Sequence, residues 1–218
     1  MNYSIQIGTQ PFSYTEPWEH KFDLVQAVKA LSFIPRFGGH VGGYSVAQHC
    51  VLVSAIAKGH EWDGLAHDLA EAYYGDFPTP LKALMRETAP TFMARIDAID
   101  MAVEQAFSFI AGSIAVKRAD QIVLATERRD LLPQACAEIW QPLPPPLRYT
   151  IYPMLPAEAE AAWWKQYHAL LGHGKAPKFP GVPPRLESVL TKDSPFAITP
   201  FAVPMHTDYP RPPFVSPL

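Results

Sequence analysis

The sequence predicts an all-α domain that is followed by an extended, proline-rich arm. Between residues 22 and 172, apolar side chains recur at helical spacing and are flanked by residues that start and stop helices. From residue 173 onward the chain holds 11 of its 24 prolines, and proline resists helix and central strand alike. We therefore divide the chain into a domain at 1–172 and an arm at 173–218. Because the arm also carries apolar side chains, we expect it to lie over the domain or over a neighbouring subunit.

The helices are predicted from local signals. The first covers 24–33, where Asp23 is the N-cap, Gln26 completes a capping-box pattern and Pro35 follows the end. The second begins behind Ser45, again with a glutamine three residues further on. The remaining predicted helices are 64–75 behind Asp63, 91–110, 114–132 and a sixth candidate at 156–172. Strand signals are poor, and only residues 3–15 are expected to form a short hairpin.

Composition limits the classes of protein and partner. A hydrophobic fraction of 48% in 218 residues allows one sizeable core. The net charge of -3 gives no basic surface, so we expect no nucleic-acid polymer as a partner. The first residues, MNYSIQIGTQPF, lack the pattern of a signal peptide, and no apolar run is long enough to span a bilayer. Cys50 and Cys136 suggest no disulfide framework. We therefore expect a cytoplasmic protein without a membrane partner.

One predicted helix, 64–75, places an imidazole and carboxylates in a run of Ala and Leu that is expected to be buried. Buried charge is costly unless it is paired or bound to a metal. His67 and Glu71 are four residues apart, and Asp68 and Glu71 are three apart, so these side chains share a helix face. His67 and Asp68 project about 100° apart on a helix, which lets both reach one ion beside it.

Two residues from other predicted helices can complete a ligand set with His67 and Asp68. His49 lies on the second helix and Asp120 on the fifth. Two imidazoles and two carboxylates suit one divalent transition metal, with Co, Mn or Zn favoured and Ni, Fe or Mg as further options. Each residue alone has an ordinary alternative, such as a hydrogen-bonded core histidine or an exposed charge on a helix rich in charged residues. Four such coincidences in order, on three helices, are the poorer explanation.

The order His49, then His67 and Asp68, then Asp120 resembles the H…HD…D signature of the HD-domain metal-dependent phosphohydrolases. YSVAQHC, HDLAEAYYGDFPTPLK and KRADQIVLATERRDL are each similar to segments of that superfamily's small nucleotidase branch, and the likeness covers about residues 22–132. Within the branch the chain resembles bacterial 5′-deoxynucleotidases and phage-type dATP triphosphohydrolases. The stretch RFGGH is similar to a pattern common in phage and prophage members, so the expected cytoplasm is that of the host if a phage encodes the chain. The fold that this resemblance implies is the HD helical bundle.

The resemblance also implies roles for individual residues. It assigns four residues to the metal: His49, His67, Asp68 and Asp120. Glu71 and Asp76 match acidic positions that position or activate the attacking water. Arg36 matches a substrate-contacting arginine, and Phe37 occupies a position often filled by tryptophan, which leaves the base or sugar preference open. Three further candidates for contact with a phosphate are each explained equally well as a solvated side chain: His40, Lys82 and Lys117.

These observations predict hydrolysis of a phosphoester in a deoxynucleotide. The favoured interpretation is a dNTP triphosphohydrolase, with dATP as one candidate substrate, that releases the deoxynucleoside and tripolyphosphate. It is favoured by RFGGH and by four cations: Lys82, Arg86, Lys117 and Arg118. The alternative is a 5′-deoxynucleotidase that hydrolyses deoxynucleoside monophosphates.

Other classes explain the sequence less well. A catalytically silent nucleotide-binding HD module does not need the full acidic set that includes Glu71 and Asp76. A cyclic-dinucleotide phosphodiesterase of the HD-GYP kind would have proline where Ser45 follows Gly42-Gly43-Tyr44. Small nucleotidases of this branch are often dimers or larger assemblies, so we also expect a homo-oligomer, with the arm as a means of tying subunits together.

Overall fold

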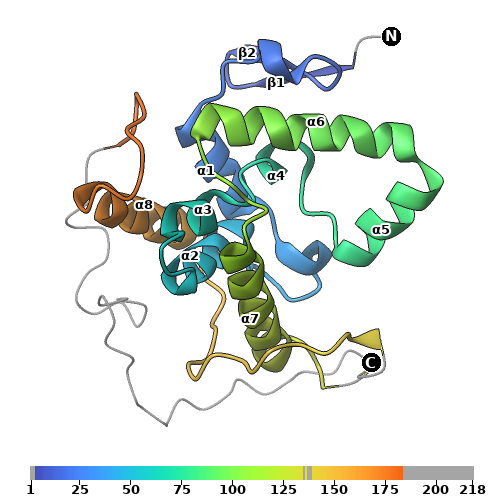
Figure 1. The fold of residues 1–218 in the computed structure, drawn as a ribbon, viewed down its shortest axis with the longest axis vertical. Coiled ribbons are helices and arrows are strands. Elements are labelled where there is room, and N and C mark those ends of the chain that lie inside the picture. The colour runs from blue at the N-terminus through green and yellow to red at the C-terminus, as the bar shows by residue number, and fades with distance from the viewer. Residues whose placement is uncertain (1–2, 135, 137–138, 184–218) are drawn as a thin grey trace. The chain divides into compact units, whose positions relative to one another are not determined.

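Helices make up most of the chain in a computed structural model, which describes residues 3–134, 136 and 139–183 (Figure 1). The helices are α1 (Leu24–Phe33), α2 (Val46–Ile56), α3 (Glu61–Ala66), α4 (Glu71–Tyr74), α5 (Thr79–Thr88), α6 (Pro90–Phe107), α7 (Ile114–Leu131) and α8 (Pro156–Gly172). Short 3-10 helices occupy Pro17–Glu19 and Arg36–Gly39. The predicted hairpin is confirmed as β1 (Ser4–Ile7) and β2 (Gln10–Ser13), which pair antiparallel. No helix among the described residues is long and apolar enough to cross a membrane.

The capping residues predicted for α1 and α2 act as N-caps. The Asp23 carboxylate accepts the N–H groups of two residues in the first turn of α1, and Ser45 Oγ accepts the N–H of Gln48. Gln48 does not close the predicted capping box. Its side chain instead donates to the carbonyl of Tyr152 at 2.7 Å and accepts the N–H of Met154 at 2.9 Å. The start of α2 is therefore tied to the segment that leads into α8.

The single helix predicted at 64–75 is wrong, because the structure divides it into α3 and α4. Residues 67–70 form a turn in which the N–H of Glu71 donates to the carbonyl of Asp68 at 3.0 Å. The imidazole Nδ1 of His67 lies 2.9 Å from the carbonyl of Gly64. In a continuous helix that carbonyl would accept the N–H of residue 68, so the side chain competes with the backbone at this point. His67 and Asp68 consequently lie on a turn.

The sequence patterns do not predict α5. None of its residues is fully buried, and Leu81 and Leu84 are 41% and 55% exposed, so its apolar residues do not mark a core-facing helix. Figure 1 shows α5 below the start of α6, into which it leads at the edge of the described domain. Lys82 extends from α5 to the carboxylate of Glu71, where the two side chains form an ion pair at 3.0 Å.

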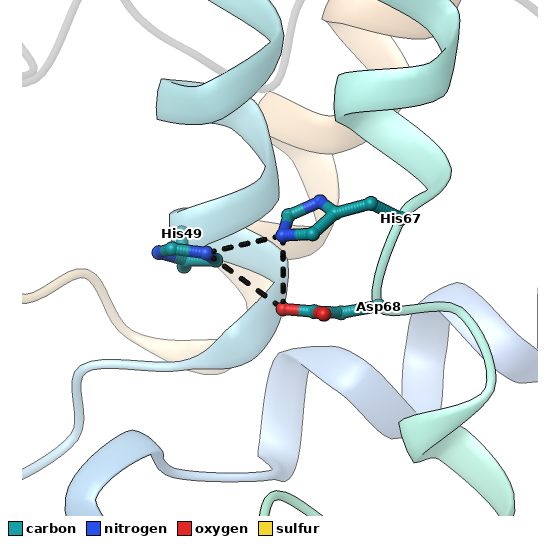
Figure 2. Close-up of side chains that lie close together, drawn as sticks. All are labelled: His49, His67 and Asp68. Carbon is teal, nitrogen blue, oxygen red and sulfur yellow. Dashed lines mark hydrogen bonds and ion pairs between the residues drawn. The ribbon is translucent and has the colours of Figure 1, made fainter. Parts of the chain in front are cut away.

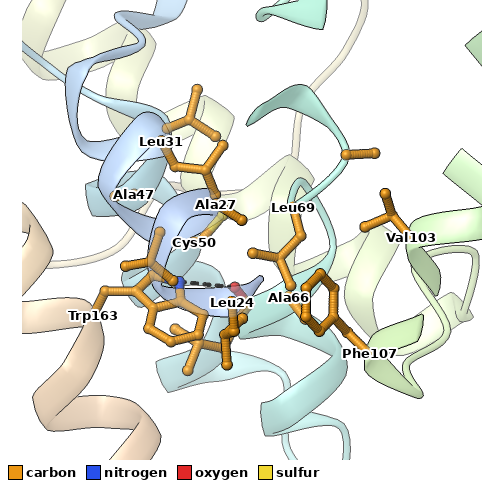
Figure 3. Packing of buried hydrophobic residues seen from close by; sticks show 14 of the residues in the cluster. Leu24, Ala27, Leu31, Ala47, Cys50, Ala66, Leu69, Val103, Phe107 and Trp163 are labelled. Carbon is orange, nitrogen blue, oxygen red and sulfur yellow. Dashed lines mark hydrogen bonds between the residues drawn. The ribbon is translucent and has the colours of Figure 1, made fainter. Parts of the chain in front are cut away.

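Aromatic and aliphatic side chains from α1, α2, α3, α6 and α8 form the main core (Figure 3). Trp163 of α8 is fully buried, and its indole N–H donates to the carbonyl of Leu65 in α3 at 3.2 Å. A second cluster holds α7 against α2 and consists of five fully or nearly fully buried residues: Val53, Ala57, Val116, Ala119 and Val123. These two clusters fix the positions of the elements that carry the candidate site.

The first part of the predicted arm packs against the domain. Phe179 lies with its ring centroid 5.8 Å from that of Trp62, and Lys175 forms an ion pair with Glu61 at 2.7 Å. The Tyr167 hydroxyl donates to the carbonyl of Pro177 at 2.8 Å. The chain thus continues to contribute to this unit beyond the end of α8. The rest of the predicted arm, 184–218, lies outside the described residues.

Candidate metal centre

His49, His67 and Asp68 each present one ligand atom to a group in which all atoms lie within 4.8 Å of one another (Figure 2). His49 Nε2 is 3.3 Å from His67 Nε2, and Asp68 Oδ2 is 3.2 Å from His67 Nε2 and 3.7 Å from His49 Nε2. We call these three residues the His-His-Asp trio. Helix α2 supplies the first ligand and the turn after α3 supplies the other two, so the packing of α3 on α2 brings them together.

Asp120, the fourth predicted ligand, lies next to the trio. It extends from α7, and its Oδ1 is 3.1 Å from His49 Nε2. It does not belong to the group whose atoms are all within 4.8 Å of one another. Its side chain is 41% exposed, whereas that of His49 is fully buried. Asp120 therefore approaches the trio from the solvent side.

The hydrogen bonds of the two imidazoles determine which ring nitrogens carry protons. His49 Nδ1 is 2.7 Å from a carboxylate oxygen of Glu127, and His67 Nδ1 is 2.9 Å from the carbonyl of Gly64. A carbonyl and an ionised carboxylate can only accept hydrogen bonds, so both Nδ1 atoms are donors. In the neutral rings both Nε2 atoms then carry lone pairs, and both point into the trio.

This donor set fits a divalent cation. Two imidazole lone pairs and the carboxylates of Asp68 and Asp120 converge, and acceptors placed this close need a positive charge between them. Burial lowers the pKa of His67, but neighbouring Asp68 raises it, and the net result is a pKa well above the usual value. The groups around His67 therefore favour its protonated, positively charged form. A bound cation would satisfy the same preference for positive charge. Imidazole and carboxylate ligands together suit Zn, Co, Mn, Fe or Ni.

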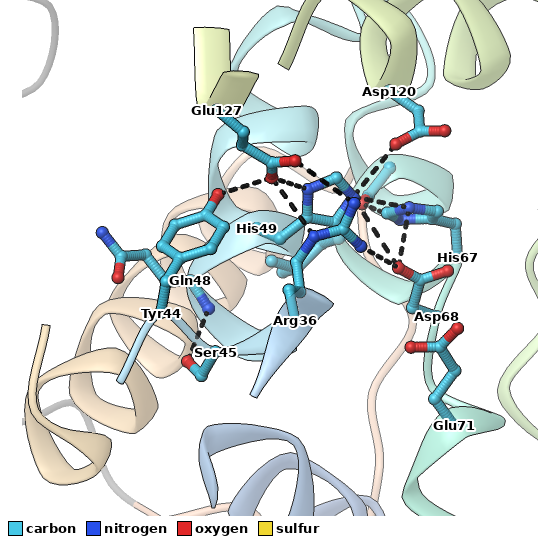
Figure 4. Close-up of polar contacts among 12 residues, drawn as sticks. Arg36, Tyr44, Ser45, Gln48, His49, His67, Asp68, Glu71, Asp120 and Glu127 are labelled. Carbon is cyan, nitrogen blue, oxygen red and sulfur yellow. Dashed lines mark hydrogen bonds and ion pairs between the residues drawn. The ribbon is translucent and has the colours of Figure 1, made fainter. Parts of the chain in front are cut away.

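Glu127 is a site residue that the sequence interpretation missed (Figure 4). Its side chain is fully buried, and besides His49 it accepts the hydroxyl of Tyr44 at 2.8 Å and Arg36 Nη2 at 3.3 Å. Burial raises the pKa of Glu127, but Arg36 and His49 lower it more, so the carboxyl has a pKa below its usual value. Glu127 follows Asp120 by seven residues, which is two helical turns on one face. That spacing is the sequence signal that could have found it.

Arg36 lies between Glu127 and the trio. Its Nη1 is 3.7 Å from Asp68 Oδ2, and its side chain is only 13% exposed. The backbone N–H of Arg36 donates to the carbonyl of Tyr44 at 2.9 Å. Phe37 has a left-handed backbone with φ of 54°, and its ring centroid lies 5.6 Å from the Arg36 guanidinium carbon. The turn thus directs Arg36 toward the predicted metal ligand Asp68.

Glu71 and Lys82 form an ion pair beside Asp68, in which Glu71 is buried and Lys82 is partly exposed. Glu71 is 3% exposed, and its Oε1 binds Lys82. Burial and neighbouring Asp68 raise the pKa of Glu71 well above its usual value, although Lys82 acts in the opposite direction. Burial likewise raises the pKa of Asp76, whose charge interacts with Arg36, Asp68 and Lys82. Glu71 therefore holds a proton more tightly than an exposed glutamate does, which is the property that a general base requires.

A cavity of about 120 Å³ adjoins the trio. Its lining includes six residues with polar side chains from the trio, the Glu71 pair and α6: His67, Asp68, Glu71, Lys82, Asp100 and Glu104. The walls also include aromatic and small apolar side chains such as Phe109 and Ala111.

Comparison with known proteins identifies a relative. No family model matches the chain. Over 147 residues the chain is 35% identical to the uncharacterized protein YfdR of Escherichia coli strain K12, and the match covers 65% of this chain and 80% of that protein. The chain belongs to the YfdR family. Because YfdR is itself described as uncharacterized, its name says nothing about activity.

Two candidate phosphate contacts lie away from the centre of this YfdR-family site. His40 and Lys117 are exposed, and within the described residues neither forms a hydrogen bond or an ion pair with the trio. Lys82, by contrast, is held beside the trio by Glu71. Of the predicted substrate contacts, Arg36 and Lys82 are therefore those that the fold brings to the candidate centre.

Proposed function

We propose that this member of the YfdR family is a metal-dependent phosphohydrolase of deoxynucleotides and that its helices form an HD-domain bundle. The observation that carries the proposal is the convergence of the His-His-Asp trio with Asp120 beside it. The same four residues follow the order H…HD…D, which resembles the signature of the HD-domain phosphohydrolases. The buried Glu71 and Arg36 next to the trio support a hydrolytic role for the site.

The residues that would hold the metal are His49, His67 and Asp68, with Asp120 as the fourth. A bound divalent transition metal would supply Lewis acidity at a phosphoryl oxygen and lower the pKa of water. Glu127 holds His49 in the tautomer that leaves Nε2 free for this purpose.

The remaining side chains have separate tasks in the proposed reaction. Water adds to the phosphorus, and the bond from phosphorus to the 5′-oxygen of the nucleoside breaks. Glu71 accepts a proton from the attacking water, and a proton is returned to the leaving 5′-oxygen. Arg36 offsets negative charge that develops on the phosphoryl oxygens. Asp76 matches an acidic position that orients the water in the proteins that the chain resembles, and its charge interacts with those of Arg36 and Lys82.

The number of phosphates on the substrate is the open part of this proposal. The resemblance of RFGGH to a phage and prophage pattern favours a triphosphate such as dATP. Two of the four cations are already paired, because Arg86 forms two hydrogen bonds with Asp97, at 2.9 and 2.7 Å, and Lys82 forms an ion pair with Glu71. Hydrolysis of a monophosphate therefore stays as the alternative.

One assay tests both forms of the proposal. The metal-free protein is incubated with Co²⁺ or Mn²⁺ and with each dNMP and dNTP, and phosphate is separated from tripolyphosphate. We expect turnover that a chelator abolishes and that Asp68→Ala eliminates together with metal content. Glu87→Gln, which changes an exposed carboxylate on α5, serves as the matched control and should keep full activity. Activity on dAMP with none on dATP would remove the triphosphate form, and nucleotide binding without any turnover would favour the non-catalytic module.

A further inference from the structure

The cavity beside the trio has an acidic lining. Asp68 and Glu71 contribute carboxylates from the side of the trio, and Asp100 and Glu104 contribute two more from consecutive turns of α6. Lys82 supplies the ammonium group among the lining residues, and it is paired with Glu71. Carboxylates in excess of cations disfavour a bound phosphate, because like charges at short range repel each other in a partly buried site.

A buried carboxylate oxygen of Glu71 indicates which kind of chemical group the cavity can bind. Glu71 Oε2 is buried and has no hydrogen-bond partner among the described residues, although Oε1 of the same carboxylate binds Lys82. Figure 4 shows the Glu71 carboxylate next to Asp68, at the edge of the trio. An unpaired buried acceptor is costly, so this atom is suited to a donor that arrives with a ligand.

The arrangement of the acidic groups does not favour a second metal ion. The carboxylates of Asp100 and Glu104 do not join the trio in the group of potential ligand atoms that lie close to one another within the described chain. Asp100 is instead engaged by the hydroxyl of Tyr74, which donates to it at 2.6 Å. Separate acceptors on different walls suit several neutral hydrogen-bond donors better than one cation.

We propose that this cavity binds the uncharged, hydrogen-bond-donating part of the nucleoside, with Glu104 and one lone pair of Glu71 Oε2 as acceptors. The second lone pair of Oε2 stays available to the attacking water. The inference rests on the proposed function, because it assigns the two ends of a nucleotide to two parts of the same site. The phosphates then lie at Arg36, which contacts Asp68 but does not line the cavity. A cavity of about 120 Å³ is smaller than typical pockets of roughly 300 Å³ or more, so it receives a sugar ring or a base edge.

This orientation has a consequence for substrate choice. Because the nucleoside occupies the cavity, the phosphate chain extends away from it toward Arg36, and the cavity walls do not limit the length of that chain. The cavity therefore discriminates among sugars or bases, and the groups around Arg36 discriminate among phosphate chains. Sugar hydroxyls and base amino groups share the required donor chemistry, and analogues distinguish them.

Binding of nucleosides to the wild-type protein tests the inference without relying on turnover. Titration calorimetry with Co²⁺-loaded protein compares 2′-deoxyadenosine with 2′,3′-dideoxyadenosine, which lacks the 3′-hydroxyl, and with purine 2′-deoxyriboside, which lacks the amino group. We expect one of the two analogues to bind about tenfold more weakly, as the loss of one hydrogen bond to a charged acceptor predicts. Loss with the first analogue identifies the sugar, and loss with the second identifies the base. Equal affinity for all three would overturn the inference.

Variants of Glu104 provide a second test of the inference. Glu104→Ala should raise KM for the nucleotide and weaken 2′-deoxyadenosine binding by about tenfold, while kcat stays within about twofold of the wild-type value. Glu104→Gln should show a smaller effect, because its amide oxygen still accepts a hydrogen bond. Glu87→Gln is the control. Unchanged KM with normal turnover would refute the inference and keep the proposed function. If nucleoside binding depends on Glu104 but no nucleotide is hydrolysed, the inference about the cavity stands and the proposed function is refuted. If the wild-type protein binds a second equivalent of Co²⁺ and Glu104→Ala does not, the cavity binds a cation and the inference is overturned.

Discussion

Glu127 Oε1 and His49 Nδ1 lie 2.7 Å apart in the interior of the protein, and neither side chain is exposed to solvent. The carboxylate has further support from Tyr44 and Arg36. This contact determines the tautomer and the orientation of an imidazole whose other nitrogen points into the trio. Partners of this kind raise the basicity of a ligating histidine and hold it in place.

Replacement of Glu127 should weaken metal binding without removing any ligand. We expect Glu127→Gln to lower the affinity for Co²⁺ by about 10- to 100-fold, because the charged acceptor for His49 Nδ1–H is lost. Tyr44→Phe should have a smaller effect, since it removes one donor to Glu127 and keeps the carboxylate. Titration calorimetry with Co²⁺ measures both variants, and circular dichroism verifies that they fold. Wild-type affinity in Glu127→Gln would show that the contact is purely structural.

The helices that local signals mark were predicted well, and those that tertiary contacts determine were not. Asp23 and Ser45 predict the starts of α1 and α2 because an N-cap depends on the side chain and the next three residues alone. The break between α3 and α4 depends on His67 bonding to the carbonyl of Gly64, which periodicity does not reveal. Helix α5 was missed because none of its residues is fully buried.

Some residues of the candidate site can be identified from the sequence, and others depend on how the helices pack. His49, His67 and Asp68 could be identified from the sequence because imidazoles and a carboxylate in apolar surroundings are costly without a partner. Glu127 was not identified, because a glutamate followed by Arg128 and Arg129 has the composition of an exposed helix face. Its role depends on the packing of α7 against α2, which places Glu127 beside His49. The pairing of Lys82 with Glu71 also depends on a helix that the sequence did not predict.

Replacement of Glu71 should separate catalysis from metal binding. Glu71→Gln keeps the volume of the side chain but removes a proton acceptor, so we expect kcat to fall by about 100-fold or more while Co²⁺ content stays at the wild-type level. The measurement is steady-state kinetics on the best substrate from the nucleotide screen, together with metal analysis of the purified variant. If metal content falls in parallel with kcat, Glu71 contributes to the metal site and is not the base that we propose.

Asp100 should make the stability of the protein depend on pH. Burial raises the pKa of Asp100 to about 6, in spite of the hydrogen bond from Tyr74 and the nearby charge of Lys82, and Asp97 and Glu104 act in the same direction as burial. The unfolded carboxyl has a pKa of about 3.9, so the folded state binds this proton more tightly. The contribution of Asp100 to stability is therefore present at low pH and is lost as the pH rises through about 4 to 6.

Asp100→Asn should remove this dependence, because the amide keeps an acceptor for the Tyr74 hydroxyl and carries no charge. We expect the variant to melt about 2–4 °C higher than the wild type at pH 7.5, which corresponds to about 1 kcal/mol for a chain of this size. At pH 4 the two proteins should melt at similar temperatures. Differential scanning calorimetry across this range provides the comparison, and a gain at pH 4 as large as that at pH 7.5 would contradict the assignment to Asp100.

Truncation of the chain should show where the folded unit ends. Removal of residues 173–218 takes away Phe179, which packs on Trp62, and Lys175, which pairs with Glu61. We expect that chain to unfold at a lower temperature, since full burial of one aromatic side chain contributes roughly 1.5–3 kcal/mol and Phe179 is partly buried against the core. A chain that ends after residue 183 keeps these contacts and should melt like the full-length protein.

The chain that ends after residue 183 also tests the predicted role of the arm in assembly. Gel filtration of the full-length chain and of the chain that ends after residue 183 compares their oligomeric states at equal concentration. If the arm ties subunits together, the shorter chain elutes as a smaller species while its melting temperature measured at low concentration stays unchanged. Identical elution of the two proteins would exclude 184–218 as the connection, because the contacts of residues 173–183 with Trp62, Glu61 and Tyr167 are present in both.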